Sequence, residues 1–132
     1  MRLPLVSIII TAYNYAHTVA TAIKSALAQD YPNIEVVVMD NASTDPTPAV
    51  VAAFAHDRRV RYFRNAENIG MVPNHNEGLR RAKGEYVVFL SADDFLMPDF
   101  VSRSHTYLQA QPDVDVLYTT PFFVDDHERF FA

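Results

Sequence analysis

Apolar residues along this chain fall into two alternating patterns: short runs that are mostly apolar, and longer segments with apolar positions three or four residues apart. The short runs predict strands at about residues 6–10, 34–39, 60–63, 86–90 and 114–118. The spaced positions predict helices at about 17–28, from Pro46 onwards, at 73–82 with a stop at Gly84, and at 98–110. This alternation of strand and helix indicates an α/β fold, Rossmann-like, with a mostly parallel sheet and helices on both of its faces.

Composition favours one globular domain and excludes several chemistries. The chain has 132 residues, 49% of them apolar, which is enough for one sizeable core. The lack of cysteine excludes disulfides and thiolate chemistry, and a net charge of −5 argues against a nucleic-acid partner. With three glycines in all, no glycine-rich phosphate loop is possible. Because no apolar run suits a membrane span and residues 1–4 lack a signal-peptide region, we expect a cytoplasmic location.

The most informative stretch is GEYVVFLSADDFLMP, at residues 84–98. A predicted buried strand here breaks directly into polar residues that include Asp93 and Asp94, and adjacent carboxylates raise one another's pKa unless a cation or donors compensate. Carboxylate oxygens are the ligands that Mg²⁺ and Mn²⁺ prefer, so we expect this pair to bind one of these ions. A helix cap with a first-turn acid is the alternative interpretation.

Polar residues follow two other predicted strands: Tyr13 lies in the loop after the first, and Asp40 follows the second. In a doubly wound sheet with the order 3-2-1-4, the ligand crevice opens where the first and fourth strands end. We therefore expect Tyr13, Asp40 and Asp93 to converge on one nucleoside diphosphate. Tyr13 would stack, Asp40 would accept from a base N–H, and the acid pair would hold a cation on the phosphates. The alternatives are that Tyr13 covers the strand end and that Asp40 caps a helix.

Two long segments carry a resemblance to a known family. The sequences VSIIITAYNYAHTVATAIKSALAQDYPNIEVVVMDNASTD (6–45) and ENIGMVPNHNEGLRRAKGEYVVFLSADDFLMPD (67–99) resemble the nucleotide-binding half of a family 2 glycosyltransferase of the GT-A fold. The resemblance implies a nucleotide-sugar-binding domain at residues 1–120. Residues 121–132, with four phenylalanines and no predicted partner element, would begin a truncated acceptor-binding region. A terminal segment that packs back on the surface is the alternative.

The resemblance also implies a set of donor-binding residues. These are Thr11, Ala12, Tyr13, Asn14, Asp40, Asn41, Ser43, Asn68, His75, Ala92 and Asp93. The nucleobase, usually uracil in this family, would contact the first loop and Asp40, and Asp93 matches the last acid of the D-x-D metal motif. Two positions depart from the family pattern, because Ser91 replaces the first acid of that motif and His75 stands where an arginine is usual. A surface histidine without a ligand role is the alternative for His75.

The implied reaction is inverting transfer of a hexosyl group from a nucleotide diphosphate sugar, expected to be a UDP-sugar, to an acceptor hydroxyl. Mn²⁺ or Mg²⁺ would act as a Lewis acid on the leaving diphosphate. The carboxylate base that deprotonates the acceptor belongs to the acceptor-binding half, so we expect it outside this chain. The expected partners are the donor and a glycan, lipid or small-molecule acceptor. A full-length protein bound peripherally to the inner face of a membrane is compatible with this expectation.

Two other function classes remain open at this point. A non-catalytic nucleotide-sugar-binding module is favoured by the departures at Ser91 and His75. A phosphoacceptor signalling domain fits the length and the alternation, with Asp40 as the acceptor. Such a domain carries its metal-binding acids after the first strand, however, and residues 11–13 contain no carboxylate.

Overall fold

The computed structural model describes residues 2–127 and 129–131. Its long strands are β1 (Val6–Ala12), β2 (Ile34–Asp40), β3 (Val60–Arg64) and β4 (Tyr86–Ser91). Its helices are α1 (Val19–Leu27), α2 (Thr47–Ala52), α3 (Met71–Arg81) and α4 (Phe100–Ala110). The chain forms two compact units, Met1–Ser102 and Arg103–Ala132, and the first unit contains the sheet.

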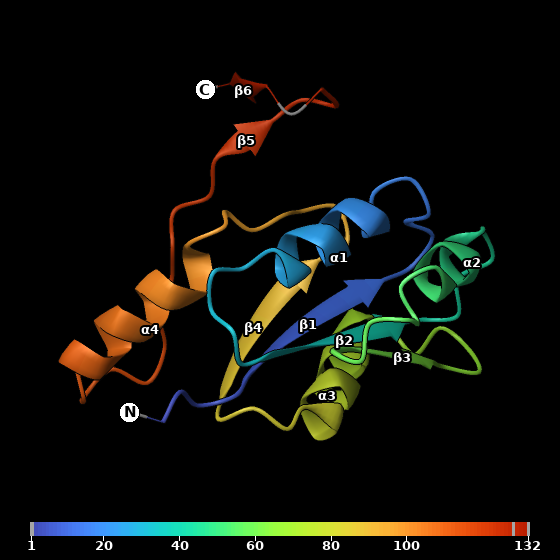
Figure 1. The fold of residues 1–132 in the computed structure, drawn as a ribbon. Helices are drawn as coiled ribbons and strands as arrows, with labels where there is room; N and C mark the ends of the chain where they lie inside the picture. Colours follow the sequence, from blue (N-terminus) through green and yellow to red (C-terminus); the bar gives the residue numbers. More distant parts are fainter. Residues whose placement is uncertain (1, 128, 132) are drawn as a thin grey trace. The chain divides into compact units, whose positions relative to one another are not determined.

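The four long strands form a parallel sheet in the order β3-β2-β1-β4, as the sequence predicts (Figure 1). Every residue of β2 is buried, and so is nearly every residue of β1. This burial on both faces explains why most residues of the two strands are apolar on both sides of the sheet. Because all four strands run in the same direction, their carboxyl ends meet at one edge of the sheet.

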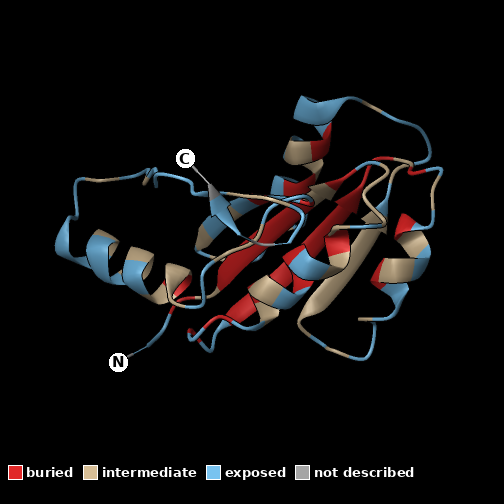
Figure 2. Ribbon diagram, turned by 90° about the horizontal axis from the view of Figure 1, so that it is seen from above, coloured by how far each residue is buried: buried red, intermediate tan, exposed pale blue. Residues whose placement is uncertain are grey.

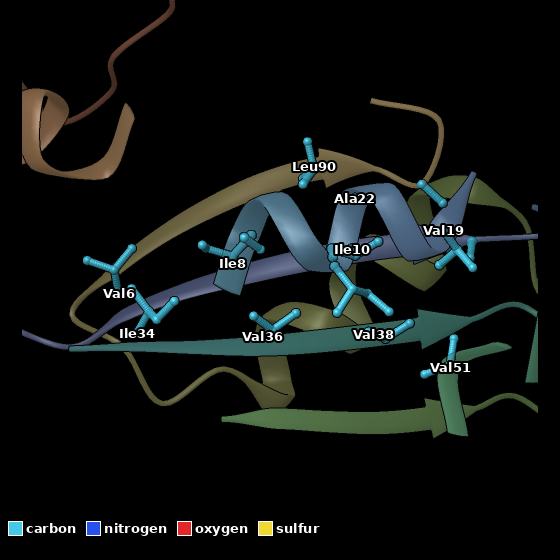
Figure 3. Packing of buried hydrophobic residues seen from close by; sticks show 14 of the residues in the cluster. Val6, Ile8, Ile10, Val19, Ala22, Ile34, Val36, Val38, Val51 and Leu90 are labelled. Carbon is cyan, nitrogen blue, oxygen red and sulfur yellow. The ribbon is translucent and has the colours of Figure 1, made fainter. Parts of the chain in front are cut away.

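Helices cover both faces of the sheet, with α1 and α2 on one face and α3 on the other (Figure 1). Buried residues concentrate in the central strands (Figure 2). The main core lies between the sheet and α1 and includes Val6, Ile8, Ile10, Val19, Ala22, Val36, Val38 and Leu90 (Figure 3). A smaller cluster of Ile9, Val37 and Met39 lies on the α3 side. The layered α/β fold predicted from the sequence is therefore confirmed.

Two glycines allow close contacts on the α3 side of the sheet. A Cβ atom at Gly78 would lie 2.5 Å from Cγ2 of Ile9, so the missing side chain lets α3 contact the sheet directly. A Cβ atom at Gly84 would lie 2.6 Å from the backbone nitrogen of Ser7. Because α3 already ends at Arg81, Gly84 allows the chain to pass close to β1 and does not cap the helix.

A buried carboxylate holds the segment after α3 against the sheet. Glu35 of β2 is 7% exposed and accepts hydrogen bonds from the Ser7 hydroxyl at 2.6 Å and the Lys83 N–H at 2.7 Å. It also pairs with the Arg61 guanidinium at 2.9 Å. Burial by itself would raise the pKa of Glu35, but these partners outweigh burial and hold the pKa below its ordinary value.

The prediction of a fifth strand at residues 114–118 is wrong. These residues are irregular, and the side chains of Val116 and Tyr118 are 68% and 92% exposed. An apolar segment forms a stable strand only when a neighbouring strand pairs with it. In the described part of the chain, residues 114–118 pair with no strand. The second unit instead contains a short antiparallel hairpin of β5 (Phe123–Val124) and β6 (Phe130–Phe131).

The boundary between the two compact units falls between Ser102 and Arg103 in the sequence. The nucleotide-sugar-binding domain expected at residues 1–120 stays a prediction. The assignment of residues 121–132 to an acceptor-binding region stays a prediction. Residues 128 and 132 of that region lie outside the described residues.

Candidate functional site

The strand register brings three polar loops to the carboxyl edge of the sheet. Ala12 at the end of β1 lies beside Asp40 at the end of β2, and Thr11 lies beside Ser91 at the end of β4. Neighbouring strands in a sheet are about 5 Å apart, so the loops that follow β1, β2 and β4 begin next to one another. The structure thus places the predicted residues after these three strands along one continuous edge.

Hydrogen bonds join the loop after β1 to the loop after β2. Asn14 has a left-handed backbone (φ 61°), and its side-chain oxygen accepts bonds from the N–H groups of Thr44 at 2.8 Å and Asp45 at 3.2 Å. In return, the Asn14 N–H donates to the Ser43 hydroxyl at 2.9 Å. These hydrogen bonds hold the two loops in a defined shape, and Tyr13 in the loop after β1 is 43% exposed.

Asp40 is directed into the protein. Its side chain is 0% exposed, and one oxygen accepts a hydrogen bond from the Ser43 N–H at 2.8 Å. The other oxygen accepts from the Tyr62 hydroxyl at 2.6 Å and lies 3.5 Å from the Arg64 guanidinium. In this conformation the carboxylate holds the loop after β2, and a direct contact with a nucleobase would require these bonds to open.

Asp93 and Asp94 have the opposite environment, because both are exposed in a turn directly after β4. The Asp94 N–H donates to the Ser91 carbonyl at 3.0 Å and closes this turn. Partial burial and the neighbouring charge of Asp93 raise the pKa of Asp94. Tyr15, in the loop after β1, directs its hydroxyl to Asp93, whose charge raises the pKa of the tyrosine. Since α4 begins only at residue 100, the two acids do not cap that helix.

This pair of carboxylates fits a divalent cation that protein and ligand share. Across residues 2–127 and 129–131, no cluster of three or more His, Cys, Asp or Glu side chains is arranged to hold a metal. Mg²⁺ commonly binds to one or two carboxylates together with water and the phosphate oxygens of a substrate. Asp93 and Asp94 supply that number of carboxylates, and a cation between them would relieve their mutual repulsion.

Three predicted residues remain: Ala92 is fully buried directly after β4, Asn68 lies in the loop that leads into α3, and His75 lies on α3 itself. The side-chain oxygen of Asn68 accepts a hydrogen bond from Asn41 at 2.8 Å, so Asn68 is tied to the end of β2. His75 lies in the second turn of α3, where Nδ1 donates to the Met71 carbonyl at 2.8 Å. Its ring lies 5.0 Å from the ring of Phe89 on β4. The structure therefore ties Asn68 to Asn41, and the ligand roles of Asn68 and His75 both stay predictions.

Sequence reasoning missed the residues that support the site from neighbouring elements. These are Tyr15, Tyr62, Arg64, Asn65 and Asn74. The abundance of asparagine between residues 65 and 76 was an available signal, because asparagine side chains often bond to nearby backbone in loops. The tyrosine partners had no local signal, since each reaches an acid that is distant in the sequence.

The pattern of glycosyl transferase family 2 matches residues 7–131, which is nearly the whole chain. This chain belongs to glycosyl transferase family 2. The match confirms the resemblance found in the sequence.

Named relatives support the assignment to this family. Succinoglycan biosynthesis protein ExoO of Rhizobium meliloti is 42% identical over 102 residues, which is 77% of this chain and 29% of that protein. The Escherichia coli protein WfaP, a UDP-Glc:alpha-D-GlcNAc-diphosphoundecaprenol beta-1,3-glucosyltransferase, is 36% identical over 107 residues. That match covers 81% of this chain and 42% of WfaP.

Solved structures share the fold. The mannosyltransferase PcManGT of Pyrobaculum calidifontis, in complex with GDP-Man and Mn²⁺, has a TM-score of 0.75 at 32% identity. Residues 1–349 of S. aureus TarS, in complex with UDP-GlcNAc, have a TM-score of 0.76 at 26% identity. This chain covers 33% and 32% of those two chains, so it spans a minor part of the proteins it resembles.

No helix among the described residues has the length and apolar character required to cross a membrane. The cytoplasmic location expected from the sequence stays a prediction.

Proposed function

We propose that this family 2 glycosyltransferase domain binds a nucleotide diphosphate sugar, with uridine as the first choice of nucleoside, together with Mn²⁺ or Mg²⁺. The observation that carries the proposal is the meeting of the loops after β1, β2 and β4 at one edge, with an exposed carboxylate pair at its end. Ligands of open α/β sheets bind in this position. The GDP-Man, UDP-GlcNAc and Mn²⁺ complexes of the structural neighbours support the same ligand class.

Each part of the edge suits a different part of such a donor. Tyr13 offers an exposed aromatic face on which a base can stack. Asp93 and Asp94 would hold the divalent cation, which when bound neutralises charge on the leaving diphosphate as a Lewis acid. Asp40 would act indirectly, by fixing the loop that contains Asn41 and Ser43.

The reaction we propose for the whole protein is inverting transfer of a hexosyl group to an acceptor hydroxyl. Inversion requires a general base on the acceptor side, opposite the leaving diphosphate. We assign that base to none of the described residues, because Asp93 and Asp94, the exposed acids at the site, would hold the cation. Donor binding with little transfer by residues 1–132 is therefore expected, and radiolabel transfer at the rate of a full-length relative would contradict this.

Two experiments on the 132-residue chain test the proposal. The first is a thermal-shift screen with UDP, GDP and their sugar conjugates, each with and without Mn²⁺. We expect one nucleoside diphosphate to stabilise the chain, and Mn²⁺ to increase the shift. The second is calorimetry with the best ligand to measure the stoichiometry, expected to be one. If no nucleotide shifts the melting temperature under either condition, the proposed function is wrong.

A phosphoacceptor role is disfavoured by one specific observation. Its acceptor would be Asp40, which is 0% exposed and hydrogen-bonded through both oxygens. A non-catalytic donor-binding module would give the same binding results as the proposed enzyme domain. A transfer assay on a longer chain that includes the acceptor-binding half separates the two.

A further inference from the structure

Four asparagine side chains form a hydrogen-bonded network beside the candidate site. The asparagine network consists of Asn41 after β2, Asn65 after β3, Asn68 in the loop that follows and Asn74 on α3. Asn41 and Asn74 are 5% and 2% exposed. The network thus joins three chain segments through two buried amide groups, Asn41 and Asn74, together with the half-buried Asn65 and the exposed Asn68.

Asn41 uses its full hydrogen-bonding capacity within this network. Its Nδ2 group donates to the side-chain oxygen of Asn68 at 2.8 Å and to the Gly70 carbonyl at 3.2 Å. Its Oδ1 atom accepts from Asn65 Nδ2 at 3.0 Å and from the Ile69 N–H at 3.0 Å. A side-chain amide can donate two bonds and accept two, whereas a carboxylate of the same shape donates none. The position therefore requires an amide.

Asn74 extends the network to α3. Its Nδ2 group donates to the Met39 carbonyl near the end of β2 at 3.1 Å, and its Oδ1 atom accepts from Asn65 at 2.8 Å. The helix begins directly after Gly70, which has a left-handed φ of 88° and donates its N–H to Asn68 at 2.9 Å. Buried polar groups with satisfied hydrogen bonds make a structure rigid. Asn41 and Asn74 are the buried members of this network, and their bonds hold the loop at 65–70 and the first turns of α3 to the end of β2.

We propose that Asn41, Asn65 and Asn74 are positioning residues for the nucleoside part of the donor, an inference that rests on the proposed function. They hold the loop at 65–70 and the start of α3 at the ends of β2 and β3. The network itself lies at the ends of β2 and β3, which the sheet order β3-β2-β1-β4 places away from the carboxylate pair that follows β4, whereas the second turn of α3 reaches Phe89 of β4 through His75. Substitution of these asparagines should therefore weaken binding of the base and ribose. The increase in nucleotide affinity that the metal provides should stay the same.

The test compares nucleotide affinity in two variants and a matched control. Asn41→Asp keeps the shape of the side chain and removes two donors, and Asn65→Ala removes two bonds from a half-buried position. Ser7→Ala is the control, because it removes buried hydrogen bonds to Glu35 and Gly84 at the opposite end of the sheet. Calorimetry measures UMP and GMP without metal, and then UDP and GDP with and without Mn²⁺, at a temperature where each variant is folded.

We expect both asparagine variants to bind the preferred monophosphate at least fivefold more weakly than the wild type. The factor by which Mn²⁺ strengthens diphosphate binding should stay within twofold of the wild-type factor, and Ser7→Ala should bind like the wild type. Wild-type affinity in both asparagine variants, or a loss confined to the Mn²⁺ factor, would overturn the inference. If the wild type binds no nucleotide under any condition, the proposed function itself fails.

Hydrogen exchange in the unaltered chain gives a second measurement. It serves as the test if the Asn41→Asp variant does not fold. The Ile69 N–H, which donates to Asn41, should exchange at least tenfold more slowly than the exposed Glu67 N–H in the same loop. Equal exchange rates at these two amides would contradict a rigid network.

Discussion

At the scale of single residues, two acids at strand ends have opposite environments. Asp40 lies between strands, and β3 supplies Tyr62 and Arg64 to its carboxylate. Asp93 follows β4, which is an edge strand of this sheet and, among the residues that the structure describes, pairs with β1 alone. Asp40 is therefore buried and bonded to protein groups, whereas Asp93 is exposed and able to bind a cation.

The first prediction concerns the exposed acid. Asp93→Ala should abolish the increase in melting temperature that Mn²⁺ adds to the nucleotide effect, because Asp93 is the acid expected to contact the cation directly. The melting temperature without ligand should change by less than 2 °C, as expected for an exposed position. Asp30→Ala, an exposed acid at the other end of the sheet, is the control. A Mn²⁺ shift that survives in Asp93→Ala would remove this residue from the site.

The second prediction concerns the buried acid. Tyr62→Phe removes the 2.6 Å hydrogen bond to Asp40, and the loss of a bond to a buried charged group costs about 1.5–3 kcal/mol of unfolding free energy. Tyr31→Phe removes a 2.7 Å bond to the neutral Pro4 carbonyl and should cost about 1 kcal/mol. Urea denaturation measures both values. A smaller loss in Tyr62→Phe than in Tyr31→Phe would show that Asp40 is not a buried charge.

At the scale of elements, α3 connects the site to the sheet. Its residue Gly78 contacts Ile9, and the asparagine network fixes its first turns. Its carboxyl end leads into the segment that Glu35 holds. The position of α3 is therefore determined at both ends, and a change at either end should be measurable as a loss of stability.

The third prediction tests the close contact of α3. Gly78→Ala places a methyl group 2.5 Å from Ile9 and 3.2 Å from Met39, so the helix must move or the side chains must shift. We expect a loss of about 1–3 kcal/mol from overpacking, although alanine favours the helix by about 1 kcal/mol. Asn76→Ala, an exposed position on the same helix, should be neutral or slightly stabilising. A stabilised Gly78→Ala variant in urea denaturation would contradict this packing.

The fourth prediction follows from the lowered pKa of Glu35. Because its folded-state pKa lies below the ordinary value of 4.5, the ionised carboxylate stabilises the fold above about pH 4.5. That contribution should disappear as the pH falls through the lower, folded-state pKa. Urea denaturation between pH 7 and pH 3 should show a loss in the wild type that is reduced in Glu35→Gln. Identical pH profiles for the two proteins would exclude this role.

At the scale of the whole molecule, local sequence patterns predicted the helices and strands better than they predicted strand pairing and side-chain contacts. The runs in β1 and β2 had to be strands, because only burial on both faces suits so many consecutive β-branched residues. The run at 114–118 looked similar, yet without a partner edge it stays irregular. The acid pair after β4 was visible in the sequence, whereas the burial of Asp40 depends on Tyr62, 22 residues away. Contacts of this kind depend on how the strands pair, and local patterns in a single sequence do not reveal that pairing.

The most direct test of the central claim is an NMR titration of the ¹⁵N-labelled 132-residue chain with UDP and substoichiometric Mn²⁺. Paramagnetic Mn²⁺ held with the nucleotide at the carboxyl edge should broaden the amide signals of residues 11–14, 41–43 and 92–94 together. Residues 31–34, at the opposite edge, should keep their intensity. Broadening confined to one loop, or stronger at residues 31–34 than at residues 92–94, would contradict a shared nucleotide and metal site.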